Sequence, residues 1–455
     1  MSAPLRPPTA EIDLGIGFYA TNGPGTGGRL KVAPEDFRVR EISQYPVPFD
    51  DGDFTILRVV ARNWEQHELA RHLAQRLGLP PGAVGWAGTK DRRAISEQLL
   101  SYPGAPRPLA REPAPGIEVV EMYRARRAIV LGQHFGNFFD LTVREVPLEG
   151  EAAEARWTEV AQALRERGAF PNFFGPQRFG EVRPVTHRVG RALLAGDSEG
   201  AVAIYLGAPT DGEPPEGREA RQNYVEHGDP VRALREFPAY YTFERTLLDH
   251  LARGRGADRA LRALPRELRQ LFVHAYQSLL FNRYLTARAA SVLSLTEPEP
   301  GDFLIRLARD GTLTAREPVP VLEDNRAEAS ALVGKGRAVL AGPLVGASTP
   351  LLEGRPGELL EALLDEETLE RGSFDLPRQP EVASDGTWRP LLVAVPPIAR
   401  EPGSPPRDGD PGAYRMRFAL PKGSYATVLL REFLKSGASP APSSDAPGGG
   451  PSNQA

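Results

Sequence analysis

Cysteine is absent from this 455-residue chain, and its absence excludes disulfides, thiol nucleophiles and cysteine-ligated metal sites. Any nucleophile therefore has to be an oxygen or a nitrogen atom. The chain also lacks a run of about eighteen apolar residues, and its N-terminus lacks a basic segment followed by an apolar one. We therefore expect neither a membrane span nor a secretory signal, and we expect a cytoplasmic protein.

Lysine is scarce, and the net charge is small. A formal charge of −4 argues against a protein that coats nucleic acid by bulk attraction, although a basic cleft on an acidic body is compatible with it. A chain this rich in arginine is expected to keep lysine where a compact ammonium is needed, which singles out Lys31 and Lys90. The 55 basic residues include only five lysines: Lys31, Lys90, Lys335, Lys422 and Lys435.

The common catalytic motifs are missing. The seven histidines form no HxH or HExxH pattern, so we expect no metal. No GxSxG segment indicates a serine hydrolase. The glycine-rich GPGTGG, residues 23–28, lacks the GK[ST] ending of a phosphate-binding loop, and we interpret it as a flexible lead-in.

The chain is too long for one ordinary core and changes character twice. Its ends, residues 1–28 and 437–455, are rich in Pro, Gly, Ser or Thr, and we expect them to be flexible. Between the ends, strand patterns give way to helical periodicity and then return. This order predicts an α+β domain from residues 29–179 and 381–436, with an α-rich insertion at residues 180–380.

Apolar periodicity predicts the individual elements. Leu69, Leu73 and Leu77 recur at a spacing of four before Gly78, which is typical of a helix and its end. Alternating or β-branched residues predict strands elsewhere. The expected strands are residues 54–60, 94–101, 128–132, 138–146, 389–397 and 414–421. The expected helices are residues 64–79, 153–167, 246–254, 268–293 and 425–434.

The segment GWAGTKDRRAISEQ, residues 85–98, places one carboxylate among three cations. Asp91 is flanked by Lys90, Arg92 and Arg93. Such neighbours favour the ionised carboxylate, which is the form needed for nucleophilic attack or for stabilising positive charge at a sugar carbon. A solvated loop with a surface salt bridge explains the same residues.

Two further segments carry groups suited to RNA. In GQHFGNFFDLTVRE, Asn137 and Phe139 share one side of an expected strand and Phe138 takes the other. An aromatic ring beside an amide can read an unpaired base, although both phenylalanines also suit a hydrophobic core. In PNFFGPQRFG, Gln177 and Arg178 offer donors to phosphate, and a domain hinge explains that segment equally well.

Taken in order, six segments resemble the TruD family of tRNA pseudouridine synthases. They are GRLKVAPEDFRVRE (28–41), WAGTKDRRAISEQ (86–98), HFGNFFDLTVR (134–144), NFFGPQRFG (172–180), FVHAYQSLLFN (272–282) and FALPKGSYATVLLREF (418–433). The resemblance covers nearly the whole chain apart from its two tails. Six motifs in register are specific, whereas any one of them would be weak.

The resemblance implies a fold and a reaction. The fold is a pseudouridine synthase-type mixed sheet with flanking helices, interrupted by the family's α-rich TRUD insertion domain, which forms the other side of a cleft for tRNA. The reaction is isomerisation of a uridine, at position 13 in the D-arm of tRNA, to pseudouridine, without a cofactor. We expect tRNA as the partner and a monomer.

The resemblance also implies roles for particular residues. Asp91 falls on the catalytic aspartate and Lys31 on the lysine of the first motif, where it is expected to pair with Asp91 or a phosphate. Phe139 is expected to stack on an extruded base, and Asn137 to hold the loop or the base edge. Asp91 acts either by forming an ester or by removing a sugar proton, and the base that takes the C5 proton is not identified.

Two departures from the family pattern stand out. Tyr425 replaces the phenylalanine that the family often has in GSFAT; stacking should survive, and a buried core tyrosine is the alternative. The loop at residues 401–412 lies outside the pattern and is assigned no role.

Two other classes compete with this interpretation. One is a non-catalytic RNA-binding or RNA-remodelling protein with the same cleft, which would have no use for an acid facing a polyanion. The other is a glycosidase-like hydrolase, which needs two opposed carboxylates where only Asp91 has a distinctive setting.

Overall fold

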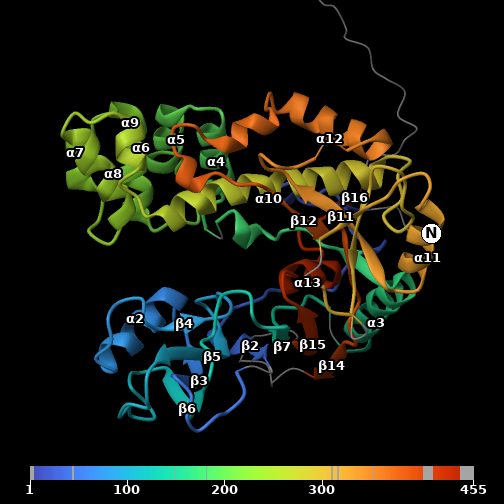
Figure 1. Ribbon diagram of the computed structural model, residues 1–455, viewed down its shortest axis with the longest axis horizontal. Coiled ribbons are helices and arrows are strands. Elements are labelled where there is room, and N and C mark those ends of the chain that lie inside the picture. The colour runs from blue at the N-terminus through green and yellow to red at the C-terminus, as the bar shows by residue number, and fades with distance from the viewer. Residues whose placement is uncertain are drawn as a thin grey trace, which may run out of the picture. The chain divides into compact units, whose positions relative to one another are not determined.

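A computed structural model describes residues 5–43, 46–148, 150–180, 182–308, 311–314, 317–350, 352–402 and 413–440. The described residues form two compact units (Figure 1). The first contains residues 20–170 and 394–440, and the second contains residues 6–19 and 171–393. The long segment of the second unit begins within β8 (Ala169–Pro171) and ends within β13 (Leu392–Ala394). The sequence predicts an insertion at residues 180–380, which is shorter at both ends.

A mixed sheet of eight strands forms the first unit, as the α+β prediction requires. Its strand order is β14-β15-β7-β2-β5-β3-β6, with β4 beside β5. Neighbours are antiparallel except for the parallel pair of β2 and β5. The strands are β2 (Phe37–Ile42), β3 (Phe54–Arg62), β4 (Gly85–Trp86), β5 (Ile95–Pro103), β6 (Ile117–Ala125), β7 (Gly136–Val143), β14 (Ala399–Pro402) and β15 (Tyr414–Pro421).

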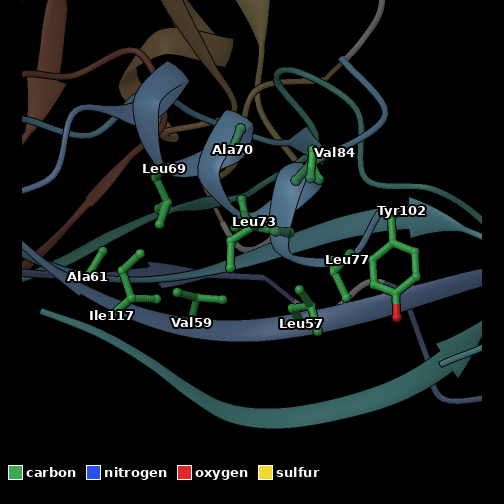
Figure 2. Close-up of a cluster of buried hydrophobic side chains, with 12 residues drawn as sticks. Leu57, Val59, Ala61, Leu69, Ala70, Leu73, Leu77, Val84, Tyr102 and Ile117 are labelled. Carbon is green, nitrogen blue, oxygen red and sulfur yellow. The ribbon is translucent and has the colours of Figure 1, made fainter. Parts of the chain in front are cut away.

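The helices of the first unit are α2 (Gln66–Arg76), α3 (Gly150–Arg167) and α13 (Ala426–Leu434). The leucine repeat that predicts α2 is the face that it buries. Leu69, Leu73 and Leu77 join Leu57 and Val59 of β3 in one buried cluster (Figure 2). Each fully buried leucine stabilises the fold by roughly 1.5–3 kcal/mol, so this cluster fixes α2 on the sheet.

Residues 20–28 pack on α13, so the expectation of a flexible segment is wrong here. The buried carboxylate of Glu432 accepts hydrogen bonds from the backbone N–H groups of Ala20 (2.9 Å) and Thr21 (3.0 Å). The ammonium of Lys435 donates to the carbonyl oxygens of Thr21 (2.8 Å) and Gly23 (2.7 Å). Buried charges thus satisfy the backbone of a segment that has no apolar periodicity of its own.

Residues 6–19 belong to the second unit, where they are packed rather than flexible. They contain α1 (Thr9–Ile12), and the amide of Asn282 donates to the carbonyl of Leu14 (2.9 Å). The predicted tail at 441–455 and most of the 401–412 loop, residues 403–412, lie outside the described residues.

The second unit is mainly helical, as predicted, and also contains a small sheet that the sequence did not predict. The sheet has the order β10-β9-β11-β12 and is antiparallel throughout. Its strands are β9 (Phe303–Arg306), β10 (Val319–Pro320), β11 (Ala338–Leu344) and β12 (Thr387–Pro390). The helices are α4 (Thr186–Leu194), α5 (Ser198–Leu206), α6 (Pro215–His227), α7 (Pro230–Glu236), α8 (Thr242–Ala252), α9 (Ala257–Leu261), α10 (Arg266–Ala290), α11 (Arg326–Gly334) and α12 (Gly354–Glu366).

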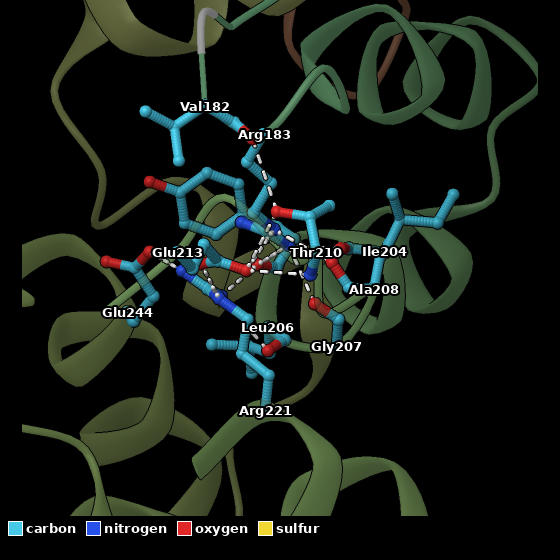
Figure 3. Close-up of polar contacts among 11 residues, drawn as sticks. Val182, Arg183, Ile204, Leu206, Gly207, Ala208, Thr210, Glu213, Arg221 and Glu244 are labelled. Atoms are coloured by element: carbon cyan, nitrogen blue, oxygen red, sulfur yellow. Dashed lines mark hydrogen bonds and ion pairs between the residues drawn. The ribbon is translucent and has the colours of Figure 1, made fainter. Parts of the chain in front are cut away.

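A buried ion network stabilises the helical part of this unit (Figure 3). The guanidinium of Arg221, on α6, pairs with Glu213 and with Glu244 of α8, each at 2.7 Å. It also donates to the carbonyl of Tyr205 (2.9 Å) at the end of α5. One arginine therefore joins three helices and the loop between two of them.

Residues 128–132, predicted as a strand, form part of the loop between β6 and β7 instead. Ile129 is buried, but Leu131 is 74% exposed, and Gly132 has a φ of +82° that ends any extended run. The apolar residues Val130 and Leu131 are therefore exposed on a loop, and only Ile129 of this run joins the core. Among the described residues, no helix combines the length and the apolar character needed to cross a membrane.

Candidate active site

Asp91 lies on the loop between β4 and β5 and forms an ion pair with Lys31. The Lys31 ammonium lies 3.0 Å from Oδ2 of Asp91. The Asp91 side chain is 33% exposed, whereas that of Lys31 is only 10% exposed. The Asp91 carboxylate is therefore accessible to a substrate in solvent, while its counter-charge, the Lys31 ammonium, is nearly buried.

Two of the three cations next to Asp91 in the sequence have other partners, which corrects the sequence interpretation. Lys90 turns away to Glu41, 3.0 Å from Oε2, and also donates to the carbonyl of Gly88 (3.1 Å). Arg93 donates to the carbonyl of Val32 (2.7 Å). The chain bends at residues 92–94, so side chains that are neighbours in sequence need not be neighbours in space.

Lys31 sits in a strained conformation above an aromatic cluster. Its φ of +55° lies in the left-handed region, which costs a non-glycine residue about 1–3 kcal/mol and is found most often at functional sites. Its ammonium lies 4.7 Å from the centre of the Phe37 ring. Phe37 contacts Phe139 edge to face at 6.2 Å, and Phe139 lies 5.5 Å from Phe418.

Phe139 offers little surface for stacking. It is 7% exposed and contacts Phe37 and Phe418, so the ring is mostly covered and does not present the expected open stacking face. Asn137, on the same side of β7, lies opposite Glu41 of β2. Its Oδ1 is buried and accepts no hydrogen bond from the described residues, which leaves an acceptor for a ligand.

Sequence reasoning missed Glu41 and His134, which complete the surroundings of Lys90. A Cβ on Gly88 would lie 2.9 Å from Cε1 of His134 and 3.2 Å from the Lys90 ammonium, so the three groups are closely packed. Burial lowers the pKa of His134 and so favours its neutral ring. Lysine scarcity was the signal for Lys90, but no spacing indicates a partner 49 residues away.

Tyr425 and Arg178 have separate settings. Tyr425 precedes α13 and is half-buried, and the preceding Lys422 donates to the carbonyl of Gly132 (2.7 Å), which ties this segment to the loop before Asn137. Arg178 belongs to the second unit, where it donates to the hydroxyl of Ser278 (3.0 Å). The first unit thus contains Lys31, Asp91, Asn137, Phe139 and Tyr425.

Asp91 is the partly exposed carboxylate of this group, whereas Glu41 is buried against Lys90. Among the described residues, no group of three or more histidine, aspartate or glutamate side chains is placed to hold a metal ion. Asp91 combines partial exposure with a fixed counter-charge, the Lys31 ammonium that lies over the Phe37 ring, which suits stabilisation of positive charge at a sugar carbon.

A family model described as tRNA pseudouridine synthase D (TruD) matches residues 13–433 of the chain. The chain belongs to the TruD family. This confirms the family inferred from the six sequence motifs, and it makes the protein a tRNA pseudouridine synthase of the isomerase class.

Individual TruD proteins match over almost their whole length. A protein of Halobacterium salinarum named "Probable tRNA pseudouridine synthase D" is 40% identical over 438 residues, which is 93% of this chain and 97% of that protein. One of the same name from Archaeoglobus fulgidus is 39% identical over 426 residues, covering 93% and 99%. The crystal structure of a TruD protein from Methanosarcina mazei matches with a TM-score of 0.76 and 32% identity, covering 94% and 98%. The mixed α+β fold is therefore that of a TruD protein.

Proposed function

We propose that this TruD protein converts uridine 13 in the D-arm of tRNA to pseudouridine, with Asp91 as the catalytic carboxylate. The observation that carries the assignment of Asp91 is its ion pair with the nearly buried Lys31, at 3.0 Å, while a third of its own side chain stays open to solvent. Position 13 is supported by the resemblance of the sequence motifs to the family.

The reaction breaks the bond between N1 of uracil and C1′ of the ribose and forms a bond between C5 and C1′. C5 loses a proton and N1 gains one, so the product is an isomer and no redox partner is needed. Asp91 serves this chemistry either by forming an ester at C1′ or by removing a sugar proton. In both routes the ion pair with Lys31 holds the Asp91 carboxylate in position, and the left-handed backbone of Lys31 directs its ammonium toward that carboxylate.

The uridine has to leave the RNA stack before C1′ can be reached, at a cost of a few kcal/mol. The buried, unpaired Oδ1 of Asn137 is suited to accept the N3–H of the extruded uracil. The small exposed part of Phe139 and the half-buried ring of Tyr425 supply apolar contact, and Arg178 of the second unit binds phosphate.

The test is to incubate the purified protein with unmodified tRNA and to measure pseudouridine by nucleoside chromatography. The parent chain should convert one uridine per tRNA. Asp91→Asn should convert none while it still binds tRNA, because the amide is similar in shape but cannot attack or accept a proton as the carboxylate does. Asp211→Asn, which changes an exposed aspartate of the second unit, is the matched control and should act like the parent.

Three outcomes would contradict the proposal at different points. Equal conversion by Asp91→Asn would remove this residue from the reaction. Conversion of a transcript in which uridine 13 is replaced by cytidine would show that another position is modified. Binding of tRNA without any conversion by the parent would favour the non-catalytic RNA-binding alternative.

A further inference from the structure

A hollow of about 490 Å³ opens on the first unit, outside the site described above. Its lining consists of residues 46–49, Arg126, Arg127 and Gln133. Val47 is exposed and Phe49 is partly exposed, although both are large apolar residues. Exposed apolar groups gathered at a hollow and flanked by cations are typical of a ligand-binding surface.

The walls of the hollow are fixed. The backbone N–H of Phe49 donates to the carbonyl of Arg124 (2.8 Å), and the hydroxyl of Tyr123 donates to the carbonyl of Pro46 (3.0 Å). The guanidinium of Arg124 donates to the carbonyl of Gly52 (2.7 Å). These bonds join the segment before β3 to β6, so the hollow is formed before any ligand arrives.

The chemistry of the lining suits a nucleotide. The guanidinium of Arg126 lies over the Phe49 ring, 3.6 Å from its centre, and is held there by a cation–π contact. Unpaired bases stack on guanidinium planes and on aromatic rings. Arg127 is exposed beside it and can pair with a phosphate, while the exposed Asp50 follows Phe49 but does not line the hollow.

The hollow adjoins the loop that carries Asp91. Arg126, Arg127 and Gln133 of its lining lie on one loop, and the N–H of Gly132 on that loop donates to the carbonyl of Ala87 (2.7 Å), four residues before Asp91. His134, next on the same loop, is close to Gly88. The loop that lines the hollow is therefore hydrogen-bonded to the loop that carries Asp91.

We propose that this hollow is a second RNA subsite, which binds an unpaired nucleotide of the substrate near the reacting uridine. The base stacks on the Arg126 guanidinium that Phe49 supports, and Arg127 pairs with a phosphate. The proposal rests on the proposed function in taking tRNA as the ligand. It does not depend on which uridine reacts or on the role of Asp91.

The experiment measures the dissociation constant of a labelled, unmodified tRNA transcript at several salt concentrations. Arg126→Lys keeps the positive charge but removes the planar guanidinium on which a base can stack. Phe49→Leu keeps an apolar side chain but removes the aromatic ring that supports the guanidinium. Each should weaken binding about tenfold with an unchanged salt dependence, because a stacked base contributes by contact rather than by charge. Arg127→Gln should reduce the slope of log affinity against log salt by about 0.7–0.9, as expected for one lost phosphate contact.

Arg111→Lys is the matched control, since Arg111 is an exposed arginine of the same unit that pairs with Glu118. It should bind tRNA like the parent. Parental affinity in both Arg126→Lys and Phe49→Leu would overturn the subsite, and so would a loss that appears only as a changed salt slope. If Phe49→Leu lowers the melting temperature, Arg126→Lys decides alone, because Arg126 is exposed. Binding needs no turnover, so this failure is distinct from failure of the proposed reaction.

Discussion

The ammonium of Lys90 occupies a space that is closed on three sides. Glu41 and the carbonyl of Gly88 accept its hydrogen bonds, and His134 packs against the same glycine. A guanidinium is broader and planar, so it cannot make these contacts without moving the loop. Because Asp91 is the next residue, a shift of Lys90 displaces the carboxylate as well.

We therefore expect Lys90→Arg to impair the protein although the charge is kept. Overpacking should lower the free energy of unfolding by about 1–3 kcal/mol, and the displaced Asp91 should lower the rate of tRNA isomerisation. Urea unfolding and single-turnover kinetics measure the two effects. Lys335→Arg, at an exposed lysine of the second unit, should change neither. Parental stability and rate in Lys90→Arg would show that the space tolerates the larger group.

The sequence indicates which residues matter more readily than it indicates what they touch. Lysine scarcity and the family motifs selected Lys31, Lys90 and Asp91. The contacts of Lys90 could not be predicted, because strand pairing brings Glu41 beside the loop from a distant part of the chain. The burial of Phe139 follows from contacts with Phe37 and Phe418, which alternation along one strand does not reveal.

At the scale of elements, α4 contains a histidine that couples the fold to pH. His187 is buried against the Phe179 ring, and its Nδ1 has no hydrogen-bond partner among the described residues. Burial lowers its pKa to about 4, against an ordinary value near 6.5. Between these values the unfolded chain binds a proton that the folded chain does not, so stability falls as the pH falls.

Acidification from pH 6.5 to 4 should therefore remove up to roughly 3 kcal/mol of stability through this one group. His187→Gln should reduce that loss, although the polar amide will lower stability at neutral pH. His227→Gln, at an exposed histidine of α6, should leave the pH dependence as in the parent. Urea unfolding of the second unit at both pH values gives the comparison, and equal slopes in all three proteins would exclude His187 as the cause.

Elements with strong periodicity were predicted well, and those fixed by distant contacts were not. The leucine spacing predicted α2, and alternation predicted β15 at residues 414–421. Residues 128–132 have the apolar, β-branched composition of a strand. However, the N–H of Gly132 donates to the carbonyl of Ala87, and this segment pairs with no strand among the described residues. Hydrogen bonding to a loop has therefore overridden local propensity there.

At the scale of the whole molecule, composition predicted the order β, α, β and hence an inserted unit. It could not predict that residues 6–19 belong to the second unit, because their partners lie on α10, and Asn282 is 268 residues from Leu14. It could not predict the sheet of the second unit either, since those strands are short and join distant segments.

Each unit has a core of its own, so substitutions should act within the unit that contains them. Leu73→Ala removes a fully buried side chain of the first unit and should cost about 2–5 kcal/mol. Arg221→Met leaves Glu244 of the second unit buried without this counter-charge, and leaves Glu213 with only the more distant Arg183 at 3.9 Å, so it should cost about 3–5 kcal/mol. Hydrogen exchange read by mass spectrometry should show faster exchange on α2 and β3 in the first variant and on α6 and α8 in the second. If either variant opens both units equally, the chain unfolds as a single cooperative body and the two cores are not independent.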